Sequence, residues 1–128
     1  MEKNIKILLV DDETDFSQPV AFWFGSKGYY VIIATSGASA VEMVRDKKPD
    51  IVFLDLNMPI MDGASTLKKI REFDKDTPVI IVSAYADQQK IKEIEPYGIS
   101  GVFYKGADFN EGLSLLESTL RTHKRLKK

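Results

Sequence analysis

Short apolar runs alternate with longer amphipathic segments along the whole chain. The apolar runs are rich in β-branched and aromatic residues and lie at Ile5–Val10, Tyr30–Ala34, Ile51–Leu54, Val79–Val82 and Gly101–Tyr104. Because these runs are continuously apolar rather than alternating, they predict strands that are covered on both faces. The segments between and after them have helical periodicity and predict helices at Ser17–Lys27, Ala38–Lys47, Ala64–Phe73, Asp87–Glu95 and Phe109–Lys124.

The strict order of five strand–helix units predicts the fold class. Such an order favours an α/β protein with a doubly wound parallel sheet, helices on both faces and right-handed crossovers. The 128 residues fit one domain, and the sequence has no evident linker or internal repeat. We therefore expect a single domain over residues 1–128, in which the basic residues 121–128 are either a helix end or the start of a linker.

Two residues set the expected limits of the first helix. A proline inside a helix costs about 3 kcal/mol, so we predict that the helix begins near Ser17 as N-cap, with Pro19 in its first turn. Gly28 is expected to end the helix before the next strand.

Composition and charge narrow the class of protein. A hydrophobic content of 44% excludes a disordered chain, and a net charge of -1 favours neither nucleic acid nor an acidic membrane surface as a direct partner. With 0 Cys, disulfides and thiolate metal sites are excluded, which fits a reducing compartment. No apolar run approaches the ~20 residues that span a bilayer, and the first residues lack a signal-peptide pattern. We expect a cytoplasmic domain.

Polar side chains follow four of the five predicted strands. They are Asp11 and Asp12 after the first strand, Asp55 after the third, Ser83 after the fourth and Lys105 after the fifth. Because functional groups in a doubly wound sheet gather beyond the carboxyl ends of the strands, we expect these side chains to converge on one site. Asp55 would lie at the point where the sheet stops being buried.

These residue types predict a particular chemistry. Three carboxylates repel one another unless a cation lies between them, and an all-oxygen set without nearby His or Cys suits Mg²⁺. The charges of the three Asp side chains and Lys105 sum to about −2, which one divalent cation balances. Asp55 would then attack a phosphoryl group as a nucleophile. The ion, the Ser83 hydroxyl and the Lys105 ammonium would bind the equatorial oxygens of that group.

The ordered motifs resemble the response-regulator receiver domain of two-component signalling, and the resemblance covers essentially the whole chain. The residues that carry it are Asp11-Asp12, Asp55, Asn57, Met58-Pro59, Asp62-Gly63, Ser83-Ala84 and Lys105. The resemblance implies a flavodoxin-like (βα)5 fold with a five-stranded parallel sheet in the order 2-1-3-4-5.

The resemblance also implies the function and the partners. Asp55 would accept a phosphoryl group from the phosphohistidine of a sensor histidine kinase or a histidine phosphotransfer protein, and Ser83 and Lys105 would sense and hold that group. The domain would be a switch that changes its interaction surface, as a monomer or a phosphorylation-dependent homodimer. It would catalyse its own phosphorylation and slow dephosphorylation rather than act as a turnover enzyme. The cognate kinase and the downstream effector or output domain are not specified by the sequence.

The metal ligands follow from the same resemblance. It implies Mg²⁺ bound by the side chains of Asp12 and Asp55 and by the main-chain carbonyl of Asn57, with Asp11 acting mainly through water.

Each of these features also has a simpler interpretation. Singly, the acidic pair and Ser83 suit helix caps, Asp55 suits a turn, and Lys105 suits a solvated surface position, but all of these readings would have to hold at once. A flavodoxin-like cofactor binder needs a phosphate-friendly loop after the first strand, where this chain has DDETD. A phosphatase of the haloacid dehalogenase type needs Asp-x-Asp there. The remaining alternative is a receiver-like interaction module that acts without phosphorylation.

Two positions depart from the family pattern. Gly106 follows Lys105 where the family usually has a cis proline, so we expect a trans bond and a more mobile loop. Val102 stands where the family often has an aromatic switch residue. We further hypothesise that Tyr85 reaches over the phosphoryl group and shields it from water.

Overall fold

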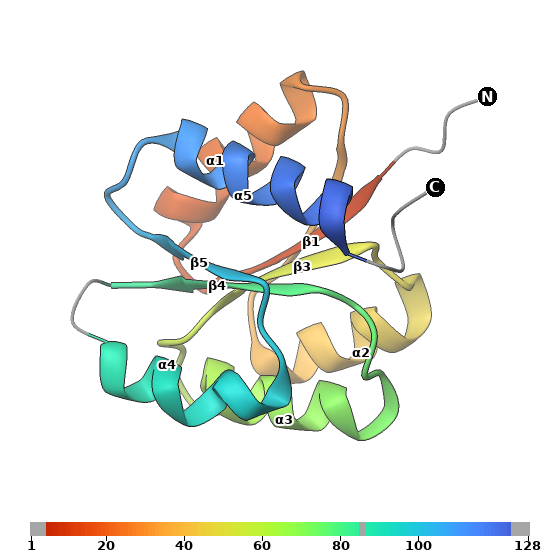
Figure 1. Cartoon of the computed structure of the whole chain (residues 1–128), viewed down its shortest axis with the longest axis vertical. Helices are drawn as coiled ribbons and strands as arrows, with labels where there is room; N and C mark the ends of the chain where they lie inside the picture. Colours follow the sequence, from red (N-terminus) through yellow and green to blue (C-terminus); the bar gives the residue numbers. More distant parts are fainter. Residues whose placement is uncertain (1–4, 85–86, 124–128) are drawn as a thin grey trace.

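The computed structural model describes residues 5–84 and 87–123, and within them five strands form one parallel sheet in the order β2-β1-β3-β4-β5 (Figure 1). The strands are β1 (Lys6–Val10), β2 (Tyr30–Ala34), β3 (Ile51–Asp55), β4 (Val79–Ser83) and β5 (Gly101–Tyr104). The helices are α1 (Thr14–Ser26), α2 (Gly37–Lys47), α3 (Gly63–Phe73), α4 (Gln88–Ile94) and α5 (Phe109–Thr122), with a 3₁₀ turn η1 (Glu95–Tyr97) after α4. The predicted doubly wound, flavodoxin-like fold and its strand order are confirmed.

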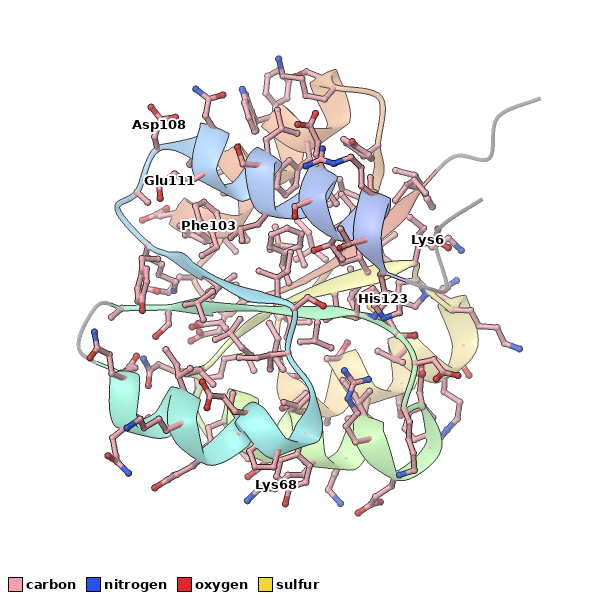
Figure 2. All side chains as sticks on the ribbon, viewed as in Figure 1. Lys6, Lys68, Phe103, Asp108, Glu111 and His123 are labelled. Carbon is pink, nitrogen blue, oxygen red and sulfur yellow. The ribbon has the colours of Figure 1, made fainter. Side chains whose placement is uncertain are left out.

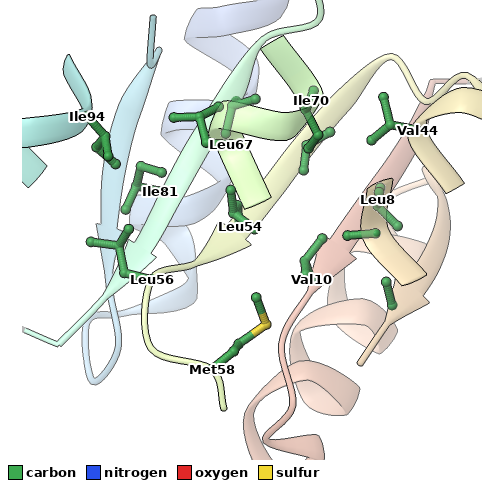
Figure 3. Close-up of a cluster of buried hydrophobic side chains, with 14 of the residues drawn as sticks. Leu8, Val10, Val44, Leu54, Leu56, Met58, Leu67, Ile70, Ile81 and Ile94 are labelled. Atoms are coloured by element: carbon green, nitrogen blue, oxygen red, sulfur yellow. The ribbon is translucent and has the colours of Figure 1, made fainter. Parts of the chain in front are cut away.

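Helices cover both faces of the sheet, with α1 and α5 on one face and α2, α3 and α4 on the other (Figure 1). Alternate residues of each strand therefore enter two different cores. Leu54 and Ile81 belong to the core beneath α2 and α3 (Figure 3), whereas Phe103 points from β5 toward α5 (Figure 2). Burying each such side chain stabilises the fold by about 1.5–3 kcal/mol, which explains why the central strands are apolar without interruption.

The start of α1 differs from the prediction, which was wrong by about one turn. The helix begins at Thr14, so that Pro19 lies inside it and Ser17 is a buried helical residue rather than the N-cap. The turn before the helix is held by Asp11, whose Oδ1 accepts a hydrogen bond from the Glu13 backbone N–H at 2.8 Å. This hydrogen bond fixes the start of the helix. The helix tolerates the loss of the one backbone hydrogen bond that Pro19 cannot donate.

Two further helix ends follow the expected cap chemistry, whereas the start of α4 does not. Gly28 follows α1 with a φ of 99°, as expected for a helix stop. Asp62 accepts a hydrogen bond from the Ser65 backbone N–H at 2.9 Å and so caps α3. Asp87 occupies the N-cap position of α4, yet its side chain makes no capping hydrogen bond.

The carboxyl-terminal end is shorter in the structure than in the prediction. α5 ends at Thr122 with His123 as its C-cap, whereas the sequence suggested a helix to Lys124. Residues 124–128 lie outside the described residues, so the choice between a helix end and a linker for residues 121–128 stays a prediction beyond His123. No helix within the described ranges is long and apolar enough to cross a membrane.

Candidate functional site

The pairing of the strands brings the predicted site residues to one edge of the sheet. Asp55 pairs with Val82, so Ser83 lies one step further along the neighbouring strand. The Lys105 backbone N–H donates to the carbonyl oxygen of Ser83 at 2.9 Å, which continues the pairing beyond β5. Asp11 follows the last residue of β1, the strand on the other side of β3. The convergence predicted from the strand ends is therefore observed.

The three aspartates of the prediction form one cluster. One carboxylate oxygen from each of Asp11, Asp12 and Asp55 lies within 4.8 Å of the other two. Asp11 and Asp55 are buried, with 0% and 1% of their surface exposed, while Asp12 is exposed. The expectation that burial stops at Asp55 was wrong, because Leu56 is also buried and continues the apolar core past the end of the strand (Figure 3).

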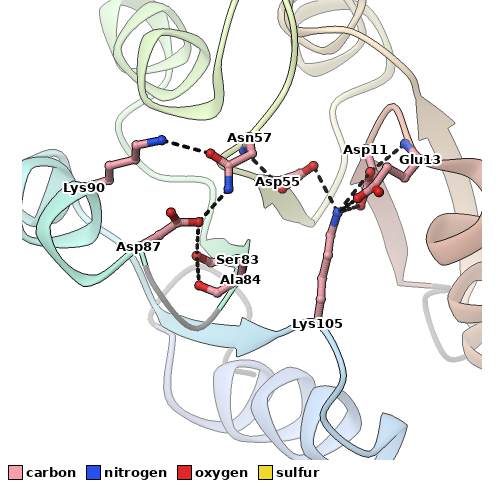
Figure 4. Close-up of polar contacts among 9 residues, drawn as sticks. All are labelled: Asp11, Glu13, Asp55, Asn57, Ser83, Ala84, Asp87, Lys90 and Lys105. Carbon is pink, nitrogen blue, oxygen red and sulfur yellow. Dashed lines mark hydrogen bonds and ion pairs between the residues drawn. The ribbon is translucent and has the colours of Figure 1, made fainter.

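Lys105 joins the cluster from the end of β5. Its Nζ lies 3.2 Å from Asp11 Oδ2 and 3.3 Å from Asp55 Oδ2, and it also pairs with the Glu13 carboxylate (Figure 4). The same Nζ lies 5.1 Å from the centre of the Phe16 ring, in a cation–π contact. Burial disfavours the charged ammonium, but the hydrogen bond with Glu13 and the nearby aspartates outweigh it and raise the pKa of Lys105. Lys105 is therefore a permanent cation in the site.

The ionisation of Asp55 is finely balanced. The pKa of Asp55 is raised overall from 3.8 to about 6, mainly by burial, and the charge of Asp11 acts in the same direction. The backbone N–H of Asn57, which donates to Asp55 Oδ1 at 3.1 Å, and the ammonium of Lys105 act in the opposite direction. Any further cation beside this carboxyl would favour the carboxylate form, which is the form that attacks as a nucleophile.

The donor set fits a hard divalent cation. Asp11 Oδ2 is buried and accepts no hydrogen bond, although the Lys105 ammonium is near it. The four carboxylates of Asp11, Asp12, Glu13 and Asp55, with one ammonium, leave a charge of about −3 that Mg²⁺ would largely neutralise. Nothing in the contacts described tests the main-chain carbonyl of Asn57 as a ligand, and its role stays a prediction.

The Ser83 hydroxyl is engaged away from the acidic cluster. Its Oγ lies 3.0 Å from Asp87 Oδ2 and 2.9 Å from the carbonyl oxygen of Ala84 (Figure 4). The Asn57 side-chain amide donates to the same Asp87 oxygen at 2.5 Å, and Lys90 donates to Asn57 Oδ1 at 3.0 Å. Ser83 is thus beside Asp55 in the sheet, but its hydroxyl points to another partner.

Several residues of the site were missed by the sequence analysis. Glu13, Phe16, Asp87 and Lys90 all contact residues that were predicted. The only available signal was proximity in the sequence, because Glu13 extends the acidic pair and Asp87 lies four residues after Ser83.

The two departures from the family pattern are visible in the structure. The bond between Lys105 and Gly106 is trans, as expected, and Gly106 has a φ of 90°. Val102 is partly buried on the same face of β5 as Tyr104, and it borders a groove along α5 whose other lining residues include Glu111 and Leu115. The hypothesis about Tyr85 concerns a residue outside the described ranges.

Comparisons with known proteins place the chain in a family. The family model for the response regulator receiver domain matches residues 7–117. Sporulation initiation phosphotransferase F of Bacillus subtilis is 35% identical over 108 residues, which cover 84% of this chain and 87% of that protein. The transcriptional regulatory protein ZraR of Escherichia coli O157:H7 is 36% identical over 121 residues, which cover 94% of this chain but only 27% of that regulator.

Solved structures agree with the sequence comparisons. The CheX–CheY–BeF3–Mg complex of Borrelia burgdorferi contains a chain that is 33% identical, with a TM-score of 0.84 over 91% of this chain and 89% of that one. Since the family model spans residues 7–117, which is most of the chain, this chain belongs to the response regulator receiver domain family.

Proposed function

We propose that this receiver domain is a phosphorylation-controlled switch in which Asp55 accepts a phosphoryl group from the phosphohistidine of a sensor histidine kinase or a histidine phosphotransfer protein. The proposal is supported mainly by the charged residues that surround the carboxyl of Asp55. Its buried carboxyl lies in one cluster with Asp11 and Asp12, and the Lys105 ammonium bridges it to Asp11. A buried carboxylate flanked by a cation and by ligands for a second cation suits nucleophilic attack on an anionic donor.

The steps assign a role to each side chain. A carboxylate oxygen of Asp55 attacks the phosphorus atom, a P–O bond forms, and the P–N bond of the donor breaks as the imidazole leaves. The Lys105 ammonium, 3.3 Å from Asp55 Oδ2, is placed to balance charge on the transferred oxygens. The Ser83 hydroxyl reaches the same oxygens once it leaves Asp87. When bound, Mg²⁺ would supply charge neutralisation at these oxygens, held by Asp11, Asp12, Asp55 and the Asn57 carbonyl.

The product is an acyl phosphate that water attacks at phosphorus, which restores the carboxylate and releases inorganic phosphate. The chain would therefore catalyse its own phosphorylation and dephosphorylation without turning over a separate substrate. The name of the Bacillus subtilis relative, a phosphotransferase, supports a role in transfer between proteins. The alternative, an interaction module that is never phosphorylated, is disfavoured because the carboxylates of Asp11, Asp12 and Asp55 and the Lys105 ammonium gather at one edge of the sheet.

The test is the intact mass of the protein after incubation with acetyl phosphate and Mg²⁺. We expect a gain of one phosphoryl group in the wild-type chain and none in Asp55→Asn, which keeps the shape but removes the nucleophile. A wild-type chain that gains no mass would contradict the proposal. Size-exclusion chromatography of the same samples would distinguish a monomer from a phosphorylation-dependent homodimer.

A further inference from the structure

One carboxylate oxygen outside the acidic cluster holds two groups of the site together. Asp87 Oδ2 accepts hydrogen bonds from the Ser83 hydroxyl at 3.0 Å and from the Asn57 side-chain amide at 2.5 Å (Figure 4). Asn57 is held on its other side by Lys90, whose Nζ donates to Asn57 Oδ1 at 3.0 Å. The result is a closed set of contacts between the ends of β3 and β4 and the first turn of α4.

The Asp87 carboxylate does not make the N-cap hydrogen bond that its position at the start of α4 favours. Aspartate is among the preferred N-cap residues, because its side chain can accept a hydrogen bond from the exposed N–H groups of the first turn. Ser36, Asp62 and Asp108 make such bonds at the starts of α2, α3 and α5. Asp87 is the N-cap of α4 but makes none. The three residues that cap have extended backbones, with ψ of 140–174°, whereas Asp87 has a ψ of 25°. The Asp87 carboxylate would therefore cap the helix only after a change of its backbone as well as a side-chain rotation.

We propose that Asp87 is a positioning residue that holds the Ser83 hydroxyl away from Asp55 in the unphosphorylated protein and caps α4 once the phosphoryl group takes that hydroxyl. This inference rests on the proposed function, because the phosphoryl group is the competitor for Ser83. A hydroxyl has one proton to donate, and the Ala84 carbonyl oxygen at 2.9 Å already shares it with Asp87 Oδ2. Ser83 therefore cannot donate to these acceptors and to a phosphoryl oxygen at the same time. A phosphoryl group near Asp87 also adds like-charge repulsion that favours rotation of the carboxylate toward the helix N-terminus.

The segment that follows the carboxyl-terminal end of α4 is held by hydrogen bonds from α3, so a rearrangement of Asp87 is expected to affect the first turn of the helix. The buried Arg71 side chain of α3 donates to the carbonyl oxygens of Tyr97 at 2.8 Å and Gly98 at 2.9 Å, at the end of the η1 turn that follows α4. The first turn of α4, by contrast, is attached to the site through Asp87 and Lys90. Release of Ser83 would therefore alter the first turn of α4 while its carboxyl-terminal end stays in place.

The experiment compares variants that separate the two roles of Asp87. Asp87→Ser keeps a capping hydroxyl but is too short to hold Ser83, while Asp87→Ala removes both interactions. Glu93→Ala is the matched control, because it removes an exposed acidic side chain from the same helix. The affinity of the whole chain for beryllofluoride with Mg²⁺ is measured by titration calorimetry, and phosphoryl loss is followed by intact mass.

We expect Asp87→Ser to bind beryllofluoride at least fivefold more tightly than the wild type and to lose its phosphoryl group more slowly, while Glu93→Ala matches the wild type. In a Ser83→Ala background the same Asp87→Ser change should not increase the affinity for beryllofluoride any further. If Asp87 had only a structural role, the change would have the same effect with or without Ser83. Hydrogen exchange at Gln89 and Lys90 should slow with beryllofluoride in the wild type and in Asp87→Ser but not in Asp87→Ala.

The outcomes distinguish this inference from the function on which it rests. If the wild type binds beryllofluoride and Asp87→Ser binds it with unchanged affinity, the positioning role is refuted and the proposed function stands. The role is equally refuted if the effect of Asp87→Ser persists without Ser83. If the wild type takes neither beryllofluoride nor a phosphoryl group, the proposed function and this inference fail together.

Discussion

Gly63 packs directly against the backbone of Asp55, so that a Cβ at residue 63 would overlap the carbonyl oxygen of Asp55 and lie 2.6 Å from Leu56 Cα. The Gly63 N–H also donates to the carbonyl oxygen of Leu56 at 3.0 Å. The start of α3 is thus held against the strand end that carries the proposed nucleophile. Only glycine fits this approach of two backbone segments.

Replacing Gly63 by alanine should therefore destabilise the protein. The new methyl group meets backbone atoms that cannot move aside, so we expect a loss of about 2–3 kcal/mol in the free energy of unfolding, measured with urea. Gly25→Ala is the control, since a Cβ there meets nothing within 4 Å and lies in α1. That variant should be unchanged or stabilised by up to about 1 kcal/mol. Equal losses in both variants would contradict the packing argument.

Removing one carboxylate from the cluster should weaken Mg²⁺ binding and, in the absence of metal, stabilise the fold. Asp12→Ala removes an exposed member of the cluster, so Mg²⁺ binding, measured by calorimetry, should weaken at least tenfold. Without metal the same variant should unfold at a higher temperature, because repulsion within the cluster is relieved. Asp15→Ala, an exposed acidic residue of the first turn of α1, is the control of equal charge change. Unchanged Mg²⁺ affinity in Asp12→Ala would remove Asp12 from the ligand set.

The raised pKa of Asp55 predicts how stability changes with pH. A carboxyl with a pKa of about 6 when folded and 3.8 when unfolded binds its proton more tightly in the folded state. Its contribution is therefore fully present below pH 3.8 and is lost as the pH rises through 6.

Asp55→Asn has no carboxyl to ionise, so it does not lose this stability as the pH rises. In metal-free buffer the variant should be more stable than the wild type at pH 7.5, by an amount on the order of 1 kcal/mol, and the difference should shrink toward pH 4. Saturating Mg²⁺ should reduce the advantage at pH 7.5, because the ion stabilises the wild-type carboxylate. A difference in melting temperature that is independent of pH would show that Asp55 titrates normally.

Arg71 should be a major stabilising residue outside the site. It is 8% exposed, and its guanidinium donates to the backbone carbonyls of Asp74, Thr77, Tyr97 and Gly98. Arg71→Met keeps most of the apolar stem and leaves these acceptors without their donor, so we expect a loss of about 3 kcal/mol in the free energy of unfolding.

The control for Arg71 lies on the outer side of the same helix. Lys68 is exposed and contacts only the ring of Tyr97 among the contacts described, at 5.7 Å (Figure 2). Lys68→Met should change the free energy of unfolding by no more than about 1 kcal/mol. Similar losses in the two variants would mean that the carbonyl contacts of Arg71 contribute little.

The sheet and the gathering of the site were predictable because they follow from burial and topology. A central parallel strand is covered on both faces, so its sequence is apolar until it ends, and the polar residue that follows marks the edge of the sheet. Asp55, Ser83 and Lys105 were identified in this way, and the register of the strands places them side by side.

The contacts that the sequence did not predict depend on how loops turn and on which way side chains point. Pro19 suggested a later start for α1, but the turn fixed by Asp11 and Glu13 outweighs the cost of one missing hydrogen bond. No pattern in the sequence indicates that Asp87 turns its carboxylate toward Ser83 instead of capping its own helix.

The most direct test of the account is to locate the acyl phosphate in the chain. The wild-type protein is incubated with acetyl phosphate and Mg²⁺, treated with borohydride, which reduces an aspartyl phosphate to homoserine, and mapped by peptide mass spectrometry. We predict homoserine at position 55 alone, and none when Mg²⁺ is withheld. Homoserine at position 11 or 12, or a phosphoryl group recovered on a different kind of side chain, would contradict it.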